Sequence, residues 1–288
     1  MILVTGAAGK TGMAVIAALV EREAAVRALV HRADRSAAIA AQGAGQVVVG
    51  AFEDAHALVA AADGADAIYH ICPNVSPHEI AYAQSMIAAA KAAGVPRFVY
   101  HSVLHPQIEA MPHHWAKLRV EEQLLASGLA VTILQPAAYM QNILAGRRSI
   151  IEEGIYRIPY PIDTRISLVD LRDVAEAAAR VLTEDGHVGA TYELVGTDAL
   201  TQTEVARTLS HAIGKPVRAI AETVEAWETR ARASSIGDYQ RETLAAMFRS
   251  YAADGLVSNA NILTWLLGLS PITLAEFAED ALADGGQL

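Results

Sequence analysis

Short apolar runs alternate with longer segments of mixed polarity along the first half of the chain. Each run is bounded by glycine, proline or charge, and the six runs are MILVT, AVRALV, QVVVG, DAIYHI, RFVYHS and AVTILQ. Continuous apolar runs of this length are typical of strands that are buried on both faces. Between them lie alanine-rich segments of helical length, at residues 10–23, 34–42, 54–62, 77–93 and 113–127.

Strand and helix repeat five times, which predicts an α/β fold with a Rossmann-type, doubly wound parallel sheet, because each parallel connection must cross over the sheet. The alternation breaks beyond about residue 143. We therefore expect a nucleotide-binding domain at 1–142 and a smaller C-terminal substrate lobe, mainly 143–288. The stretch SLVDLRDVAEAAARVLTE, at about 165–183, is expected to return to the first domain as a strand and a helix, with Asp173 near the helix N-terminus.

The turn after the first strand, TGAAGKTG, carries three glycines, Gly6, Gly9 and Gly12. Such glycines permit a tight turn, the approach of a pyrophosphate to the backbone, and close packing of helix on sheet. The helix start, with Ala8, Lys10 and Thr11, supplies backbone amides for phosphates. The spacing is G-x-x-G-x-x-G rather than G-x-G-x-x-G, and the alternative is a plain strand-to-helix turn. Its position after a strand and before a helix favours a dinucleotide site.

The end of the second strand indicates which dinucleotide is bound. An acidic residue there would bind a ribose 2′-hydroxyl and a basic one a 2′-phosphate. The sequence VRALVHRADR places His31 and Arg32 at the end, with Arg35 a turn later. NADP(H) is therefore favoured over NAD(H), the alternative being that Arg32 is a solvated surface charge. Phe52, after the third strand, either flanks the adenine or packs in the core.

Composition limits the partners. The 288 residues are 53% hydrophobic, and 22 basic against 32 acidic side chains give a net charge of −10. Nucleic acid is not expected as a partner, since no basic patch offsets this charge. The single cysteine, Cys72, excludes an intramolecular disulfide and fits a cytoplasmic setting. Neither a signal peptide nor stable membrane insertion is expected. The partner is expected to be a small-molecule substrate, and a homodimer is left open.

Several stretches together resemble the NmrA-like branch of the atypical short-chain dehydrogenases and reductases. They are the GxxGxxG start, LVHR, PRFVYHSV, AKLRVEEQLLASGLAVTILQPAAYMQN, SLVDLRDVAEAAARVL and GATYELVGTDALTQTEVARTLSHAIGKPV, which span nearly the whole chain. The family includes quinone, azo-dye and triphenylmethane reductases, and also NmrA-type proteins that sense the dinucleotide without turnover. The resemblance therefore implies an NAD(P)-binding Rossmann protein.

The resemblance also directs attention to catalytic groups. Short-chain dehydrogenases place a serine after the fifth strand and a Tyr-x-x-x-Lys pair on the next helix. This chain has Ser102, and then His113 four residues before Lys117, so the lysine is kept and the tyrosine is not. His113 is a candidate general acid, the alternatives being a capping or exposed histidine and proton delivery from water. Lys117 is expected to anchor the cofactor. A metal is not expected, because no ligand spacing is recognisable among the histidines.

Further candidates follow the fourth and sixth strands. The resemblance implies that Cys72, Pro73 and Asn74 pass beside the nicotinamide, and that the turn QPAAYMQN covers it. The candidate contacts in that turn are Pro136, Ala137 and Ala138 for the cofactor, and Tyr139 and Met140 for the substrate. His101 and Trp227 are further substrate candidates. Tyr239, Met247, Phe248 and Tyr251 share the helical spacing around Trp227, which is also typical of a lobe core.

These features predict an NADPH-dependent reductase that transfers hydride to a small aromatic or quinonoid acceptor. The retained Lys117, together with His113, favours an enzyme. One alternative is a non-catalytic redox sensor that binds a protein partner. The other is a non-redox enzyme that retains its nicotinamide.

Overall fold

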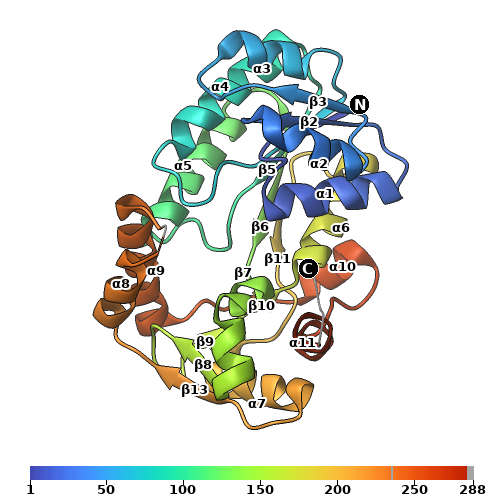
Figure 1. The fold of residues 1–288 in the computed structure, drawn as a ribbon. Coiled ribbons are helices and arrows are strands. Elements are labelled where there is room, and N and C mark those ends of the chain that lie inside the picture. The colour runs from blue at the N-terminus through green and yellow to red at the C-terminus, as the bar shows by residue number, and fades with distance from the viewer. Residues whose placement is uncertain (235, 284–288) are drawn as a thin grey trace. The chain divides into compact units, whose positions relative to one another are not determined.

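The computed structural model describes residues 1–234 and 236–283, which divide into two compact units (Figure 1). Unit 1 comprises Met1–Glu109, His113–Gln135 and Val174–Tyr192. Unit 2 comprises Ala110–Pro112, Pro136–Asp173 and the described residues from Glu193 onward. The sequence predicts a first domain of 1–142 together with about 165–183. In the structure the main part of unit 1 ends at residue 135, and the later segment that belongs to it is 174–192.

A seven-stranded parallel sheet organises unit 1, in the order β11-β6-β5-β4-β1-β2-β3. Its strands are β1 (Ile2–Val4), β2 (Val26–Val30), β3 (Gln46–Val49), β4 (Ala67–His70), β5 (Arg97–His101), β6 (Ala130–Pro136) and β11 (Thr191–Leu194). The central strand β1 pairs in parallel with both β2 and β4, with Leu3 opposite Arg27 and Ile68. All six strands predicted from apolar runs are present, and the predicted Rossmann-type fold is confirmed.

Helices cover both faces of this sheet (Figure 1). Three of them, α3 (Ala55–Ala62), α4 (Glu79–Ala92) and α5 (Pro112–Leu125), contribute to one apolar cluster with the strands. The other helices are α1 (Lys10–Glu21), the short α2 (Ser36–Ala41) after a 3₁₀ turn at Ala33–Arg35, and α6 (Leu171–Thr183). Because α4 and α5 lie on the same face, polar groups from both helices can meet beneath the same strand ends.

Unit 2 is built from short sheets and helices. Three two-stranded sheets pair β10 (Leu168–Val169) with β7 (Ala138–Tyr139), β12 (Leu200–Thr201) with β9 (Arg165–Ile166), and β13 (Arg218–Ala221) with β8 (Ile155–Ile158). The helices are the 3₁₀ segment Met140–Gly146, the π-helical Ser149–Glu153, α7 (Gln202–Ile213), α8 (Val224–Arg232), α9 (Asp238–Asp254), α10 (Asn261–Leu267) and α11 (Leu274–Leu282). Threonines in capping boxes begin α7 and α11.

One expected strand is wrong. The stretch at 165–183 was expected to return to the first domain as a strand and a helix, but only its helix lies there, as part of α6. The strand β10 pairs with β7 in unit 2, and β11 supplies the seventh strand of the large sheet. The sequence of β11, TYEL, mixes polar and apolar residues because an edge strand has one exposed side, so it lacks the continuous apolar pattern of the inner strands.

Gly12 gives a prediction about the first turn. It lies inside α1, where replacing glycine with alanine ordinarily stabilises a helix by about 1 kcal/mol. A Cβ atom there would meet the backbone oxygen of Gly6 at 2.4 Å and the Cα of Ala7 at 2.7 Å. We expect Gly12→Ala instead to lower the free energy of unfolding by about 1–3 kcal/mol, measured by urea denaturation. Gly45→Ala is the control, because its Cβ would meet only Val26 O, at 3.8 Å. Equal effects of the two substitutions would contradict the close packing at Gly12.

Candidate active site

The turn between β1 and α1 presents backbone amides at the carboxyl edge of the sheet. Gly6 adopts φ +59°, and the amide of Gly9 donates to its carbonyl at 3.0 Å. Gly9 is the N-cap of α1 and no side chain caps the helix, while Gly9 and Lys10 are exposed. An uncapped helix start with an open approach fits a pyrophosphate, because the helix dipole and the first amides attract an anion. The binding of a dinucleotide by this turn, including Ala8 and Thr11, stays a prediction.

The end of β2 carries the residues predicted to choose the cofactor. His31 and Arg32 are both exposed. The guanidinium of Arg32 donates to both carboxylate oxygens of Asp34, at 3.0 and 2.6 Å, and these bonds lower the pKa of Asp34. Arg32 therefore has an anionic partner already, and an exposed pair of this kind is weak enough to be exchanged for a phosphate.

Phe52 packs against the apolar cluster of unit 1. Its ring stacks on Tyr82 of α4 at 4.9 Å between centroids and meets His70 edge-on at 5.5 Å. The hydroxyl of Tyr82 donates to Glu53 at 2.7 Å. Core packing, one of the two interpretations of Phe52, is thus present in the structure, while its contact with adenine stays a prediction.

The loop after β4 is strained. Cys72 is buried, and burial first of all raises the pKa of its thiol, so it fills space as an inert group. Pro73 and Asn74 are exposed. The next residue, Val75, is buried with φ +49°, a conformation that is costly for a β-branched side chain. Such strain persists where the surroundings over-determine the backbone, and here the loop leads directly into Glu79 at the start of α4.

A buried ion pair joins α4, the helix that follows this loop, to α5. The ammonium of Lys117 donates to Glu79 Oε1 at 3.0 Å and to the carbonyl of His101 at 2.9 Å. It lies 5.1 Å from the ring centroid of Tyr100, whose hydroxyl also donates to Glu79 Oε1, at 2.8 Å. Lys117 is 5% exposed and Glu79 1%. An ammonium has three N–H groups, so one remains for a ligand.

Glu79 is fully charged in this setting. Burial alone raises the pKa of its carboxyl, but the Lys117 ammonium and the Tyr100 hydroxyl outweigh burial and lower that pKa to about 2. Its other oxygen, Oε2, has no hydrogen-bond partner among the described residues. No motif in the sequence points to Glu79; the only signal is a carboxylate at the first position of a helix, where the macrodipole favours it.

The face of α5 that holds Lys117 is polar along its length. His113, Lys117 and Glu121 follow one another at four-residue spacing, and all three are buried. Ser102 donates its hydroxyl to Glu121, and Gln135 donates to both oxygens of the same carboxylate, at 2.9 and 3.1 Å. Ser102 therefore already has an acceptor for its proton. Its predicted catalytic role stays a prediction.

Four histidines of unit 1, His70, His101, His113 and His114, are buried, and all are neutral. Burial first, and then the Lys117 ammonium, lower the pKa of His101 and of His113 to about 3. Burial likewise lowers the pKa of His70 and of His114 to about 4. The Glu79 carboxylate raises the pKa of His113, but by less than burial and the Lys117 ammonium lower it. His113 thus lies next to Lys117 as predicted, but as an imidazole rather than an imidazolium.

His70 links this cluster to the glycine turn. Thr5, the residue before Gly6, donates its hydroxyl to Ile71 O at 3.1 Å and lies 3.1 Å from His70 Nδ1. Which of these two atoms receives the single threonine proton is set by the tautomer of His70. Nε2 has no partner among the described residues. His70 stacks on Tyr100 at 6.0 Å, which continues the cluster toward Glu79.

The remaining candidates belong to unit 2. Pro136, Ala137 and Met140 are buried, whereas Ala138 and Tyr139 are partly exposed. Trp227 packs in the apolar cluster of α8 and α9, with its ring 4.8 Å from that of Phe248. Met247 and Tyr251 are buried and Tyr239 is 39% exposed. Their roles toward cofactor and substrate, like that of His101 in unit 1, stay predictions.

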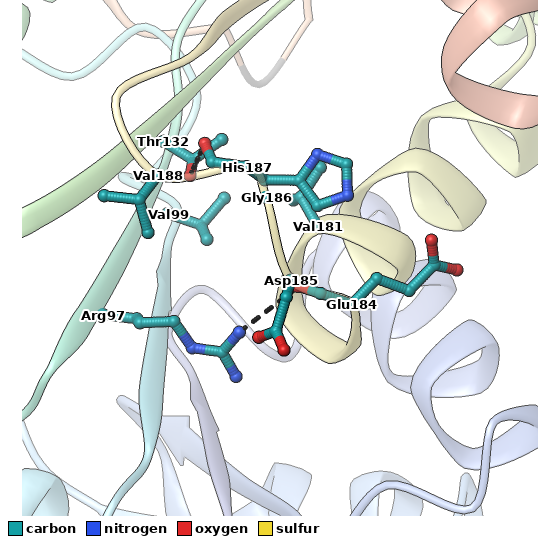
Figure 2. Close-up of a pocket in the computed structure, with 9 residues that line it drawn as sticks. All are labelled: Arg97, Val99, Thr132, Val181, Glu184, Asp185, Gly186, His187 and Val188. Carbon is teal, nitrogen blue, oxygen red and sulfur yellow. Dashed lines mark hydrogen bonds between the residues drawn. The ribbon is translucent and has the colours of Figure 1, made fainter.

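Two cavities in the described part of the chain are lined by other residues. One of about 40 Å³ adjoins the amino ends of β5 and β6, the edge opposite the glycine turn. Figure 2 shows its lining, with Thr132 donating to the carbonyl of His187 and Arg97 to that of Glu184. A second, of about 470 Å³, lies in unit 2 beside α7 and β13. The described part of the chain contains no cluster of three metal-ligating side chains, and none of its helices is long and apolar enough to cross a membrane.

The parallel sheet, the glycine turn and the polar groups at its carboxyl edge define a Rossmann-type dinucleotide-binding protein. The chain belongs to the NmrA-like family, whose model matches residues 1–277. The resemblance inferred from the sequence is thereby confirmed.

Named relatives match over nearly the full length. The chain is 34% identical to an NAD(P)H azoreductase from Xenophilus azovorans over 285 residues, 97% of each protein. It resembles the NADPH complex of a quinone oxidoreductase from Escherichia coli at 31% identity and TM-score 0.87, covering 96% of this chain and 98% of that one. It also resembles the NADP(H) complex of triphenylmethane reductase from Citrobacter sp. at 25% identity and TM-score 0.87, covering 98% and 100%. The chain is accordingly an oxidoreductase that uses NAD(P)H.

The buried histidines predict loss of stability in mild acid. The unfolded chain protonates histidine below pH 6.5, whereas His70, His101, His113 and His114 stay neutral in the folded state down to pH 3–4. Stability is therefore present above pH 6.5 and falls with pH below it, by about 1.4 kcal/mol per pH unit for each histidine. Asp173 has the opposite effect on stability. Burial raises the pKa of its carboxyl to about 6, so the folded state binds a proton that the unfolded chain binds only at lower pH.

We expect His114→Gln to reduce this slope between pH 6.5 and 4.5 by about 1.4 kcal/mol per pH unit, in urea titrations at several pH values. Glu79 does not contribute in that window, since it loses its stabilising charge only at lower pH. Identical slopes in wild type and variant would show that His114 is not held neutral.

Proposed function

We propose that this protein transfers hydride from NADPH to a small aromatic or quinonoid acceptor. The observation that carries the proposal is the buried ammonium of Lys117, held by two acceptors at the carboxyl edge of the sheet with one N–H remaining. The similar proteins support the class of acceptor. Azoreductase, quinone oxidoreductase and triphenylmethane reductase are all named for conjugated, electron-poor acceptors.

In this proposal each group of the chain has a separate task. The amides at Gly9 and at the start of α1 bind the pyrophosphate, and Arg32 binds the 2′-phosphate. The remaining N–H of Lys117 donates to the nicotinamide ribose. When bound, NADPH supplies the hydride; the acceptor gains that hydride and one proton. Since His113 is a neutral imidazole with a pKa of about 3, it carries no extra proton at neutral pH, and water delivers the proton to the acceptor.

The direct test follows NADPH absorbance with purified protein and a panel of quinones, azo dyes and aromatic ketones, with NADPH binding titrated in parallel. We expect tight binding and consumption of one NADPH for each acceptor that gains two electrons. If the protein binds NADPH tightly but no acceptor in the panel causes its oxidation, the proposed acceptor class is contradicted.

Arg32→Ala tests the choice of cofactor. Replacing an arginine that bonds a charged group costs about 1.5–3 kcal/mol, so the Kd of NADPH should rise roughly ten- to a hundredfold while that of NADH stays within about twofold. Arg119→Ala, which removes another exposed arginine paired with a carboxylate, that of Glu122, is the control and should leave both Kd values unchanged. Equal losses for both cofactors in Arg32→Ala would overturn the assignment to the 2′-phosphate.

His113→Asn tests the source of the proton. A general acid contributes about 10²–10⁴-fold to turnover. If water delivers the proton, turnover should stay within about threefold of wild type and its dependence on pH should be unchanged between pH 6 and 8. A loss of a hundredfold, with a changed pH profile, would restore His113 as the acid.

A further inference from the structure

The carboxylate of Glu79 is almost completely buried. Glu79 is 1% exposed, and one of its oxygens, Oε1, accepts from both the Lys117 ammonium and the Tyr100 hydroxyl, at 3.0 and 2.8 Å. Removing two charges from water is expensive unless geometry and further hydrogen bonds repay it, so an isolated pair of this kind contributes little to stability. A buried pair that stabilises weakly is better explained by what it fixes in place.

The atom that the pair fixes is Lys117 Nζ. A lysine has four rotatable side-chain bonds, and its ammonium is otherwise free to turn. Here Glu79 from α4 and the carbonyl of His101 from β5 hold it from two directions, at 3.0 and 2.9 Å. Two of three N–H directions are thereby assigned, which also fixes the third.

The neighbour on the same helix does not serve this purpose. Glu121 lies four residues after Lys117, a spacing at which ion pairs commonly form. Its carboxylate instead accepts from Ser102 and Gln135. The partner of Lys117 comes from a different helix, and the strained residue Val75, with φ +49°, lies in the loop that leads to it.

We infer that Glu79 is a positioning residue: it holds Lys117 Nζ so that the remaining N–H faces the nicotinamide ribose of the cofactor. This inference rests on the proposed function, in which Lys117 contacts that ribose. Glu79 itself touches no reacting atom. Its contribution reaches the cofactor only through Lys117, so its removal matters only when Lys117 is present.

A double-mutant cycle on cofactor binding tests this directly. The Kd of NADPH is measured by fluorescence titration for wild type, Glu79→Gln, Lys117→Met and the double variant. Glu79→Gln keeps the shape and an acceptor oxygen but removes the charge. We expect each single variant to raise the Kd about three- to tenfold, and the double variant to bind no more weakly than Lys117→Met alone. Independent, multiplying losses would overturn the inference.

Thr132→Val is the matched control for general destabilisation. Thr132 is 4% exposed and donates to His187 O at 2.8 Å at the opposite edge of the sheet (Figure 2). It should lower stability in urea without changing the Kd beyond twofold. If Thr132→Val raises the Kd as much as Glu79→Gln does, the effect of Glu79 is merely structural and the inference fails.

Two further results have a defined meaning: a Glu79→Gln variant that does not fold, and a Lys117→Met variant whose Kd for NADPH is unchanged. If Glu79→Gln does not fold, Glu79→Asp replaces it: the charge stays but its shorter side chain draws Nζ away, with the same expected rise in Kd and the same dependence on Lys117. If Lys117→Met leaves the Kd of NADPH unchanged, Lys117 does not contact the cofactor and the inference falls with that contact. Failure of the proposed reaction would appear separately, as wild-type protein that binds NADPH without oxidising it.

Discussion

The ion pair between Lys117 and Glu79 is the interaction on which the rest of the site depends. Its Lys117 ammonium lies at the end of β5, and burial first and then this charge keep His101 and His113 neutral. The same ammonium offsets the burial of Glu79 and keeps its carboxyl ionised. Breaking a buried pair leaves the remaining charge without a partner, so removing either residue alone is more destabilising than removing both.

The parallel sheet explains why these groups meet. Thr5, His70 and His101 follow or end the adjacent strands β1, β4 and β5, and parallel strands bring their carboxyl ends to one edge. The glycine turn after β1 and the loop after β4 begin at this same edge. α4 and α5, which cover one face of the sheet, add Glu79 and Lys117 from below. The topology thus brings the glycine turn and the buried Lys117 ammonium to one edge of the sheet.

Much of this arrangement can be predicted from the sequence, because many of its features depend on residues that are close together along the chain. Continuous apolar runs predict six strands, and the glycine spacing predicts the turn, because both are local patterns. The four-residue spacing of His113 and Lys117 correctly predicts a shared helix face. The polar edge strand β11 carries no such pattern, and the partnership of Glu79 with Lys117 joins residues 38 positions apart. Nor does spacing reveal that burial would leave His113 neutral, since a pKa depends on surroundings that only the fold supplies.

The family and the fold make this chain an NAD(P)H-dependent oxidoreductase, and the central claim is that Lys117 is pre-positioned for the nicotinamide end of the cofactor. The most direct measurement is a crystal structure of the protein with NADP bound. We expect Nζ to keep its bonds to Glu79 and to the carbonyl of His101 and to lie about 3 Å from a nicotinamide ribose hydroxyl. A cofactor seated on the glycine turn, with Lys117 contacting only protein atoms, would contradict it.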